Sequence, residues 1–116
     1  MNTVIHMKKW FLLTLLPVVC HAEIYDINTK KDPGYQYYAC VNNESVRYSK
    51  TSEPAEVAAI AALQSCSEYG DRHVFRNGMA QHLTPVQKNE LSNKLRETWK
   101  PLAIKIILDE RLKNTN

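Results

Sequence analysis

The chain has 116 residues, of which 44% are hydrophobic and 23% are charged, with only three glycines and five prolines. This composition excludes a disordered, collagen-like or low-complexity chain, and the length leaves room for one domain.

The first 22 residues have the pattern of a secretory signal peptide. A short basic head, Met7-Lys8-Lys9, precedes an apolar run of 11 residues that ends at Cys20, and a cleavage position follows Ala22. A bilayer-spanning helix needs about 20 apolar residues. We therefore expect residues 1–22 to be removed, with no transmembrane anchor left, and we expect a periplasmic or secreted protein. A start at Met1 or Met7 and a lipid on Cys20 remain open alternatives.

Removal of this segment changes the charge balance. The formal charge of +3 falls to +1, with 13 Lys and Arg against 12 Asp and Glu, which disfavours binding to nucleic acid. Residues 23–71 carry −4 and residues 72–116 carry +5. Either these are solvated halves that differ in sign and attract each other, or the basic half meets an acidic partner or an anionic envelope.

Two cysteines, Cys40 and Cys66, remain in the predicted mature chain. An exported protein with an even number of cysteines is typically disulfide-bonded, and two cysteines allow one intramolecular pairing. Redox work would need Cys-x-x-Cys, and the scattered His and carboxylates do not have recognisable metal-ligand spacing. We expect a structural disulfide, and we expect no metal and no cofactor.

The spacing of the cysteines also predicts a helical hairpin. Their midpoint is Glu53, inside Thr51-Ser52-Glu53-Pro54, where Thr51 or Ser52 is a suitable N-cap and Pro54 is tolerated in a first helical turn. Antiparallel helices joined there place residues whose numbers sum to about 106 beside each other, as the numbers of Cys40 and Cys66 do.

The first two helices are expected on either side of that corner. Residues 23–34 form an irregular N-terminal arm, and the first helix runs over about 35–49. The second helix covers about 53–69 and contains Val57 to Leu63, which is nearly two turns without a polar side chain. A helix that is apolar all round is usually buried on more than one side, so we expect central packing.

The last helix is expected to begin with a capping box. Thr84-Pro85-Val86-Gln87 places a Thr N-cap before Pro at the first position and Gln at the third. Apolar stripes then follow, and Pro101 is expected to kink or interrupt the helix near Trp99. Residues 35–113 form the helical domain and 114–116 a frayed tail. Residues 71–84 are left open as either helix, stopping at Asn77-Gly78, or loop.

Catalytic signatures are weak. Three glycines do not make a phosphate-binding loop, and no Gly-x-Ser-x-Gly elbow is present. We predict that the protein is not an enzyme; the alternative is an enzyme or small-ligand site near His73 and His82.

Candidate protein-binding residues fall in two groups. All six tyrosines lie in the acidic half, where they brace the hairpin or form a recognition surface. The predicted binding residues are Tyr35, Tyr38 and Tyr48 together with Lys94, Arg96 and Lys100 of the basic C-terminal helix.

Tyr38-Ala39-Cys40-Val41, followed by Ser52-Glu53-Pro54-Ala55-Glu56 and by Ala61-Ala62-Leu63-Gln64-Ser65-Cys66, resembles a pattern in small exported bacterial proteins of uncharacterised function. The resemblance implies a disulfide-linked helical hairpin and no activity. We expect an all-α domain of three to four helices with an antiparallel, disulfide-linked hairpin and a Pro-kinked C-terminal helix. The expected function is non-enzymatic binding of another envelope or secreted protein, of the inhibitor, immunity or envelope accessory type.

Overall fold

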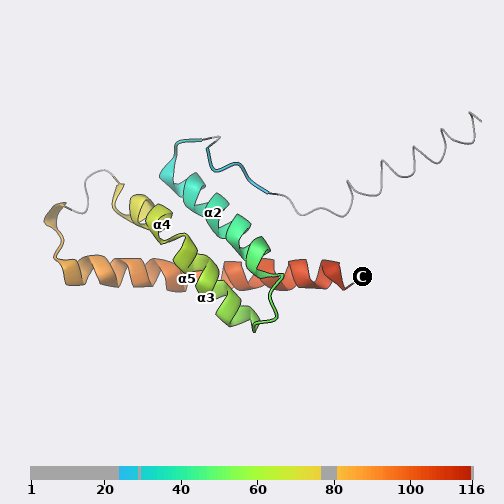
Figure 1. The fold of residues 1–116 in the computed structure, drawn as a ribbon. Helices are drawn as coiled ribbons and strands as arrows, with labels where there is room; N and C mark the ends of the chain where they lie inside the picture. The colour runs from blue at the N-terminus through green and yellow to red at the C-terminus, as the bar shows by residue number, and fades with distance from the viewer. Residues whose placement is uncertain (1–23, 29, 77–80, 116) are drawn as a thin grey trace, which may run out of the picture.

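The computed structural model describes residues 24–28, 30–76 and 81–115. Within these ranges the chain forms four helices and no strand: α2 (Pro33–Tyr48), α3 (Ala55–Ser65), α4 (Ser67–Val74) and α5 (Pro85–Asn114). The all-α fold is therefore confirmed (Figure 1). The expected signal peptide with its two candidate starts, Cys20 and the stop expected at Asn77-Gly78 lie outside the described residues.

Helix α2 begins two residues earlier than predicted. The side chain of Asp32 accepts a hydrogen bond from the backbone N–H of Tyr35, at 2.9 Å, and so acts as the N-cap. Pro33 occupies the first helical turn, where its missing N–H costs nothing. The predicted arm over residues 23–34 therefore included two residues that belong to the helix, because Asp-Pro-Gly starts the helix rather than preceding it.

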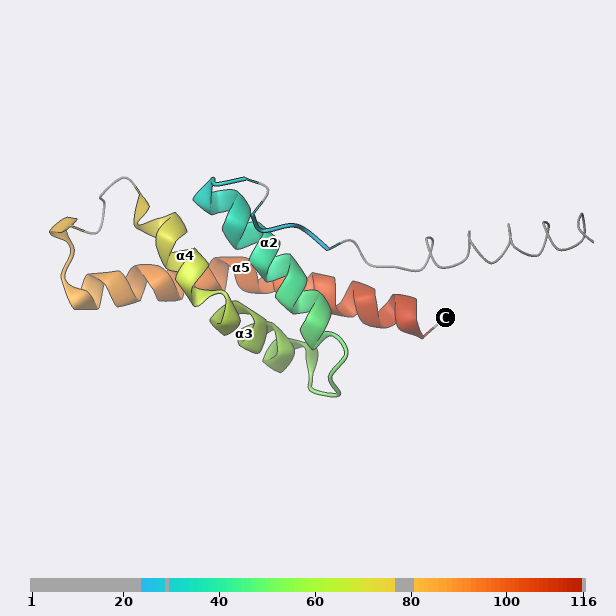
Figure 2. The ribbon, with the colours of Figure 1, turned by 45° about the horizontal axis from the view of Figure 1, so that its top comes forward.

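Helix α2 and the chain α3–α4 run antiparallel, as both ribbon views show (Figures 1 and 2). A disulfide joins Cys40 to Cys66, with 5.8 Å between the Cα atoms. One turn from the disulfide toward the start of α2, Tyr37 packs against Gly70, and one turn further on His73 lies against Gly34. Each of these pairs has numbers summing to 106 or 107, so the predicted hairpin and its register are confirmed.

The second arm of the hairpin is two helices, not the single helix predicted over residues 53–69. The backbone leaves helical geometry at Cys66, with φ −101° and ψ 11°, and α4 then continues to Val74. The predicted N-cap was also wrong, because Pro54 precedes α3 and no side chain caps it. The Thr51 hydroxyl instead donates to the carbonyl of Tyr48, which closes the end of α2.

Helix α5 crosses both arms of the hairpin and completes the domain. The predicted capping box is present: Thr84 Oγ1 accepts from the Gln87 N–H at 3.2 Å, and Gln87 Oε1 accepts from the Thr84 N–H at 2.9 Å. The helix runs through Pro101 without interruption and bends only gently near its middle (Figure 2). It extends to Asn114, so this residue, which was expected in a frayed tail, belongs to the helix.

The core lies where the two arms of the hairpin meet α5. Small side chains on α3 let the helices approach, and Ala58, Ala59 and Ala62 are buried there. The expected central packing of α3 is only partly met, since Val57 and Ile60 are exposed. Among the described residues, no helix combines the length and the apolarity needed to cross a bilayer.

Candidate functional site

Tyr37 is the aromatic centre of the core. Its ring meets Trp99 edge-on, with 4.7 Å between centroids, and stacks on His73 at 6.0 Å. The side chain is 1% exposed, and its hydroxyl has no hydrogen-bond partner among the described residues. Burial raises the pKa of Tyr37 to about 12, while the nearby charge of Arg96 opposes that rise. Tyr37 thus braces the hairpin and is closed to any partner.

Two of the predicted binding tyrosines meet the N-terminal arm. Tyr38 is half-buried, and its ring receives the edge of Tyr25 at 5.5 Å. The hydroxyl of Tyr35 donates to the Asp26 carbonyl at 3.3 Å. Both side chains therefore contact residues of this chain on the outer side of α2.

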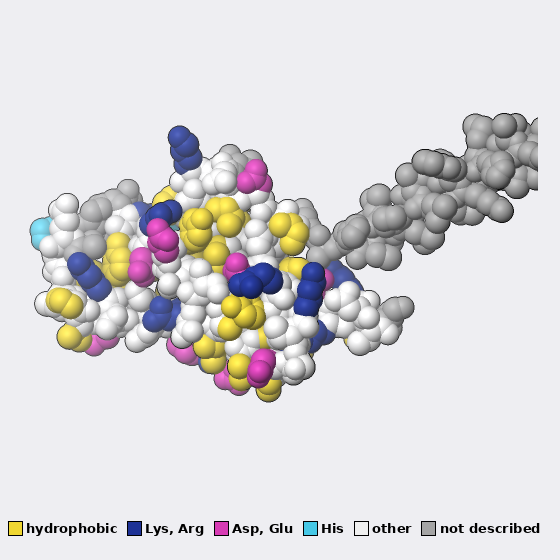
Figure 3. Space-filling view, viewed as in Figure 1, with side chains coloured by type: hydrophobic (Ala, Val, Ile, Leu, Met, Phe, Trp, Pro, Cys, Tyr) yellow, Lys and Arg dark blue, Asp and Glu magenta, His cyan; other side chains and the backbone are white. Residues whose placement is uncertain are grey.

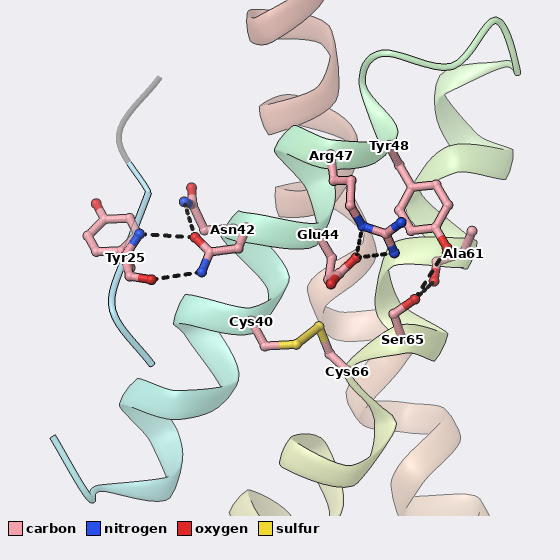
Figure 4. Close-up of a disulfide and its surroundings, with 10 residues drawn as sticks. Tyr25, Cys40, Asn42, Glu44, Arg47, Tyr48, Ala61, Ser65 and Cys66 are labelled. Atoms are coloured by element: carbon pink, nitrogen blue, oxygen red, sulfur yellow. Dashed lines mark hydrogen bonds and ion pairs between the residues drawn. A yellow bond between two sulfur atoms is a disulfide. The ribbon is translucent and has the colours of Figure 1, made fainter. Parts of the chain in front are cut away.

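Tyr48, the third predicted binding tyrosine, lies at the other end of α2. Its hydroxyl lies 3.4 Å from the Ser65 hydroxyl across the hairpin, and the guanidinium of Arg47 covers its ring (Figure 4). Arg47 in turn pairs with Glu44. Tyr48 therefore links α2 to α3 beside the disulfide and does not join Tyr35 and Tyr38 in one surface.

A shallow groove of about 180 Å³ lies between α3 and α5. It is lined by Ile60, Leu63, Gln64, Asn93, Arg96, Glu97 and Lys100. Leu63 is almost fully buried and forms the floor, whereas Ile60 is 42% exposed. The groove therefore combines an apolar floor with a polar and charged rim.

The rim contains two of the predicted binding residues. The ammonium group of Lys100 lies 3.5 Å from carboxylates of both Glu56 and Glu97. The guanidinium of Arg96 donates to the amide oxygen of Asn93, a neutral partner. Lys94, by contrast, is exposed on α5 and does not line the groove. The structure thus brings Arg96 and Lys100 together and leaves Lys94 apart.

The two histidines of the alternative site have different surroundings. His73 is half-buried against Tyr37, and its Nδ1 is 2.9 Å from the Arg76 guanidinium. Burial and the positive charge of Arg76 lower the pKa of His73. His82 is exposed, and neither histidine lines the groove. No cluster of three or more His, Cys, Asp and Glu among the described residues is placed to hold a metal ion.

The opposite charges of the two halves stay mainly on the surface. Lys100–Glu56 is the only ion pair between helices within the described ranges, since the other pairs lie within single helices. On the face drawn in Figure 3, acidic and basic side chains are interspersed with small hydrophobic patches. Few direct ion pairs therefore join the acidic half of the chain to the basic half.

Two polar residues with large structural roles were not predicted from the sequence. Asn43 binds the main chain of Tyr25 through both halves of its side-chain amide. Arg111 donates to the carbonyls of Ser49, Thr51 and Glu53 at 3.0, 2.9 and 2.6 Å. Asn43 did carry a signal, because asparagine is a poor helix former in the middle of a helix. Arg111 carried none.

Comparison of the chain with known protein families, curated proteins and solved structures finds no match to any of them. The resemblance to small exported bacterial proteins therefore stays a prediction, and any function has to be argued from the residues themselves.

Proposed function

We propose that this chain is a small exported binding protein, acting on another periplasmic or secreted protein without enzymatic chemistry of its own. The α3–α5 groove supports this proposal best. Its volume of about 180 Å³ is below the range of about 300–1,000 Å³ in which small-molecule sites usually fall. A groove of this size fits one or two side chains of a partner protein.

The chemistry of the groove indicates what those side chains would be. Ile60 and Leu63 offer an apolar floor on which a partner's aliphatic or aromatic side chain gains free energy by leaving water. Arg96, which donates to a neutral amide among the described residues, can donate to a carboxylate in a bidentate, charge-assisted geometry. The proposed partner therefore presents an apolar side chain next to an acidic one.

The disulfide supports an oxidising compartment. Disulfides persist in the periplasm and outside the cell, and thiols stay reduced in most cytosols. The Cys40–Cys66 bond is buried in the hairpin core, and the sequence carries the predicted export segment before it. Export is tested by isolating the protein from the periplasmic and culture fractions and measuring its intact mass. A chain beginning at Glu23 is expected, and full-length protein in the cytosolic fraction would contradict export.

Binding is tested by immobilising the disulfide-bonded protein and exposing it to the exported proteins of its own source. We expect a protein that wild type retains and that Ile60→Asp or Arg96→Glu reduces at least about tenfold, as expected when a central interface residue is lost. Lys94→Glu is the matched control, because it makes the same charge change on the same helix outside the groove. Equal loss with Lys94→Glu, or retention unaffected by both groove variants, would reject the groove as the binding surface.

A further inference from the structure

Residues 24–28 lie along the outer side of α2 as a short non-helical segment. The backbone N–H of Tyr25 donates to Asn43 Oδ1 at 3.0 Å, and Asn43 Nδ2 donates to the Tyr25 carbonyl at 2.8 Å. Figure 4 shows Tyr25 alongside α2, on the side away from the disulfide. The Tyr25 ring packs edge-on against Tyr38, and Ile27 packs against the core. We call residues 24–28 the strap.

The contact has the form by which proteins recognise extended peptides. An amide side chain that binds both the N–H and the C=O of one residue replaces the main-chain pairing of a neighbouring strand. Such pairing holds any residue type, so the side chains on either side give selectivity. Here Tyr25 and Ile27, two positions apart, supply an aromatic group to Tyr38 of α2 and an aliphatic group to the core.

Hydrogen bonds and ring contacts attach the strap to α2. Besides the Asn43 pair, the Tyr35 hydroxyl donates to the Asp26 carbonyl at 3.3 Å. Asp26 and Asn28 are exposed and bond to each other, and Ile24 is 61% exposed. A typical hydrogen bond contributes only about 0.5–1.5 kcal/mol net. Release of the strap breaks these hydrogen bonds and exposes Tyr25 and Ile27, but it leaves the Cys40–Cys66 bond intact, and a short tether to α2 keeps the strap near its site.

We infer that the outer side of α2, with Asn43 at its centre and Tyr35 and Tyr38 beside it, is a peptide-docking site. In the free protein the strap fills it. The partner that fits is an extended segment of another protein with an aromatic side chain followed two residues later by an aliphatic one. This site is separate from the α3–α5 groove and does not rest on the function proposed for it.

The test uses a fluorescently labelled, end-capped peptide, Ile-Tyr-Asp-Ile-Asn, titrated into full-length protein. Wild type is compared with Tyr25→Gly/Ile27→Gly, which weakens the strap, and with the same variant carrying Asn43→Leu. Because apparent affinity scales with the fraction of open sites, we expect the strap-weakened protein to bind at least about tenfold tighter than wild type. Asn43→Leu is expected to remove that gain.

Two controls make the result interpretable. Ile24→Gly changes an exposed neighbour of Tyr25 and should leave affinity at the wild-type level. Arg96→Glu changes the groove alone and should leave the titration unchanged, so this test and that of the proposed function fail independently. Helical circular dichroism and an intact disulfide, checked by mass, establish that each variant is folded.

Three outcomes would overturn the inference. The first is a folded, strap-weakened protein that does not bind the peptide. The second is peptide binding that Asn43→Leu leaves unchanged. The third is a dimer of wild type whose formation rises with concentration and is lost with Asn43→Leu, since exchange of straps between two copies would then be the use of the site.

Discussion

The two ends of the helical hairpin are held by different kinds of contact. At the free end, where α2 begins and α4 ends, Tyr37 packs between His73, Gly70 and Trp99. At the corner, residues 49–54 are held by hydrogen bonds from Arg111 of α5. The Cys40–Cys66 bond lies between them. The stability of the free end should therefore depend on the volume of the packed side chains. The stability of the corner should depend on the hydrogen-bond geometry of Arg111.

Removal of the Cys40–Cys66 disulfide tests both ends together and has the largest expected effect on stability. The disulfide closes a loop with a sequence separation of 26 residues. Cys40→Ala/Cys66→Ala should therefore lower the free energy of unfolding by about 3–4 kcal/mol, mainly because the unfolded chain becomes freer. Urea denaturation measures the loss. Reductant should lower the wild-type midpoint and leave the variant unchanged, and a wild-type midpoint insensitive to reductant would contradict the stabilising role.

Loss of Arg111 should loosen the corner alone. Its guanidinium satisfies three carbonyls that follow the end of α2, and hydrogen bonds to a charged donor are stronger than neutral ones. Arg111→Met should lower the free energy of unfolding by about 2 kcal/mol, since two of the three contacts are exposed and water partly replaces them. In hydrogen exchange, residues 49–54 should lose protection before residues 35–41 do.

Arg111→Lys is the matched control for this prediction. It keeps the charge and most of the stem but lacks the planar fork that reaches several acceptors. We expect it to recover less than half of the loss. Full recovery by lysine would show that the positive charge at the end of α2, rather than the three hydrogen bonds, holds the corner.

A single added methyl group tests how closely the free end is packed. A Cβ on Gly70 would lie 3.1 Å from Tyr37 Cε1 and 3.2 Å from Leu95 Cδ2, both inside the packed core. Alanine favours helix by about 1 kcal/mol over glycine, and overpacking costs about 1–3 kcal/mol. Gly70→Ala should therefore lower the free energy of unfolding by about 1 kcal/mol net, as thermal or urea denaturation would measure.

Gly34→Ala provides the comparison, because its Cβ would meet the exposed carboxylate of Asp32 at 3.1 Å and the His73 ring at an ordinary contact distance of 3.4 Å. A shift of the Asp32 side chain weakens the N-cap of α2, and the higher helix propensity of alanine offsets that loss, so we expect a change within about 0.5 kcal/mol. If both alanine variants were equally stable, the contact between α4 and Tyr37 would have room for an added methyl group at position 70.

Whether the sequence could predict an interaction depends on how many positions separate its two residues along the chain. The Thr84 capping box is made within four residues, and the disulfide pairing follows from two cysteines and one corner. Both were predictable from residue type and spacing. Asn43 meets Tyr25 across 18 positions, and Arg111 meets Ser49 across 62. Those contacts depend on how the helices are placed, which residue type alone does not encode.

The same reasoning explains the break at Cys66. The apolar pattern of residues 53–69 continues through it, so the sequence predicted one helix. The turn redirects α4 so that Gly70 meets Tyr37 while Cys66 remains bonded to Cys40. That requirement arises from three residues on two arms, and no local pattern of helix formers reveals it. For the groove, the basic residues were predictable, but Ile60 opposite them was not.

The Tyr37 hydroxyl offers the finest test of the free end. Because it is buried without a partner among the described residues, Tyr37→Phe removes a polar group that gains nothing from folding. At pH 7 we expect no loss of stability, or a gain of up to about 1 kcal/mol, whereas Tyr37→Ala would leave a large cavity. A clear loss with phenylalanine would mean that the hydroxyl does have a partner.

The pH dependence of this variant carries a definite sign. The pKa of Tyr37 is raised to about 12 in the folded state, because burial disfavours the phenolate, and it is about 10 in the unfolded chain. The unfolded state therefore loses its proton first, and the stability that neutral Tyr37 contributes declines as pH rises from 10 to 12. Wild type should lose stability over this window more steeply than Tyr37→Phe. Identical slopes in urea denaturation at pH 10–12 would show that Tyr37 reaches water, and the free end would then not be the sealed aromatic contact that distinguishes it from the corner.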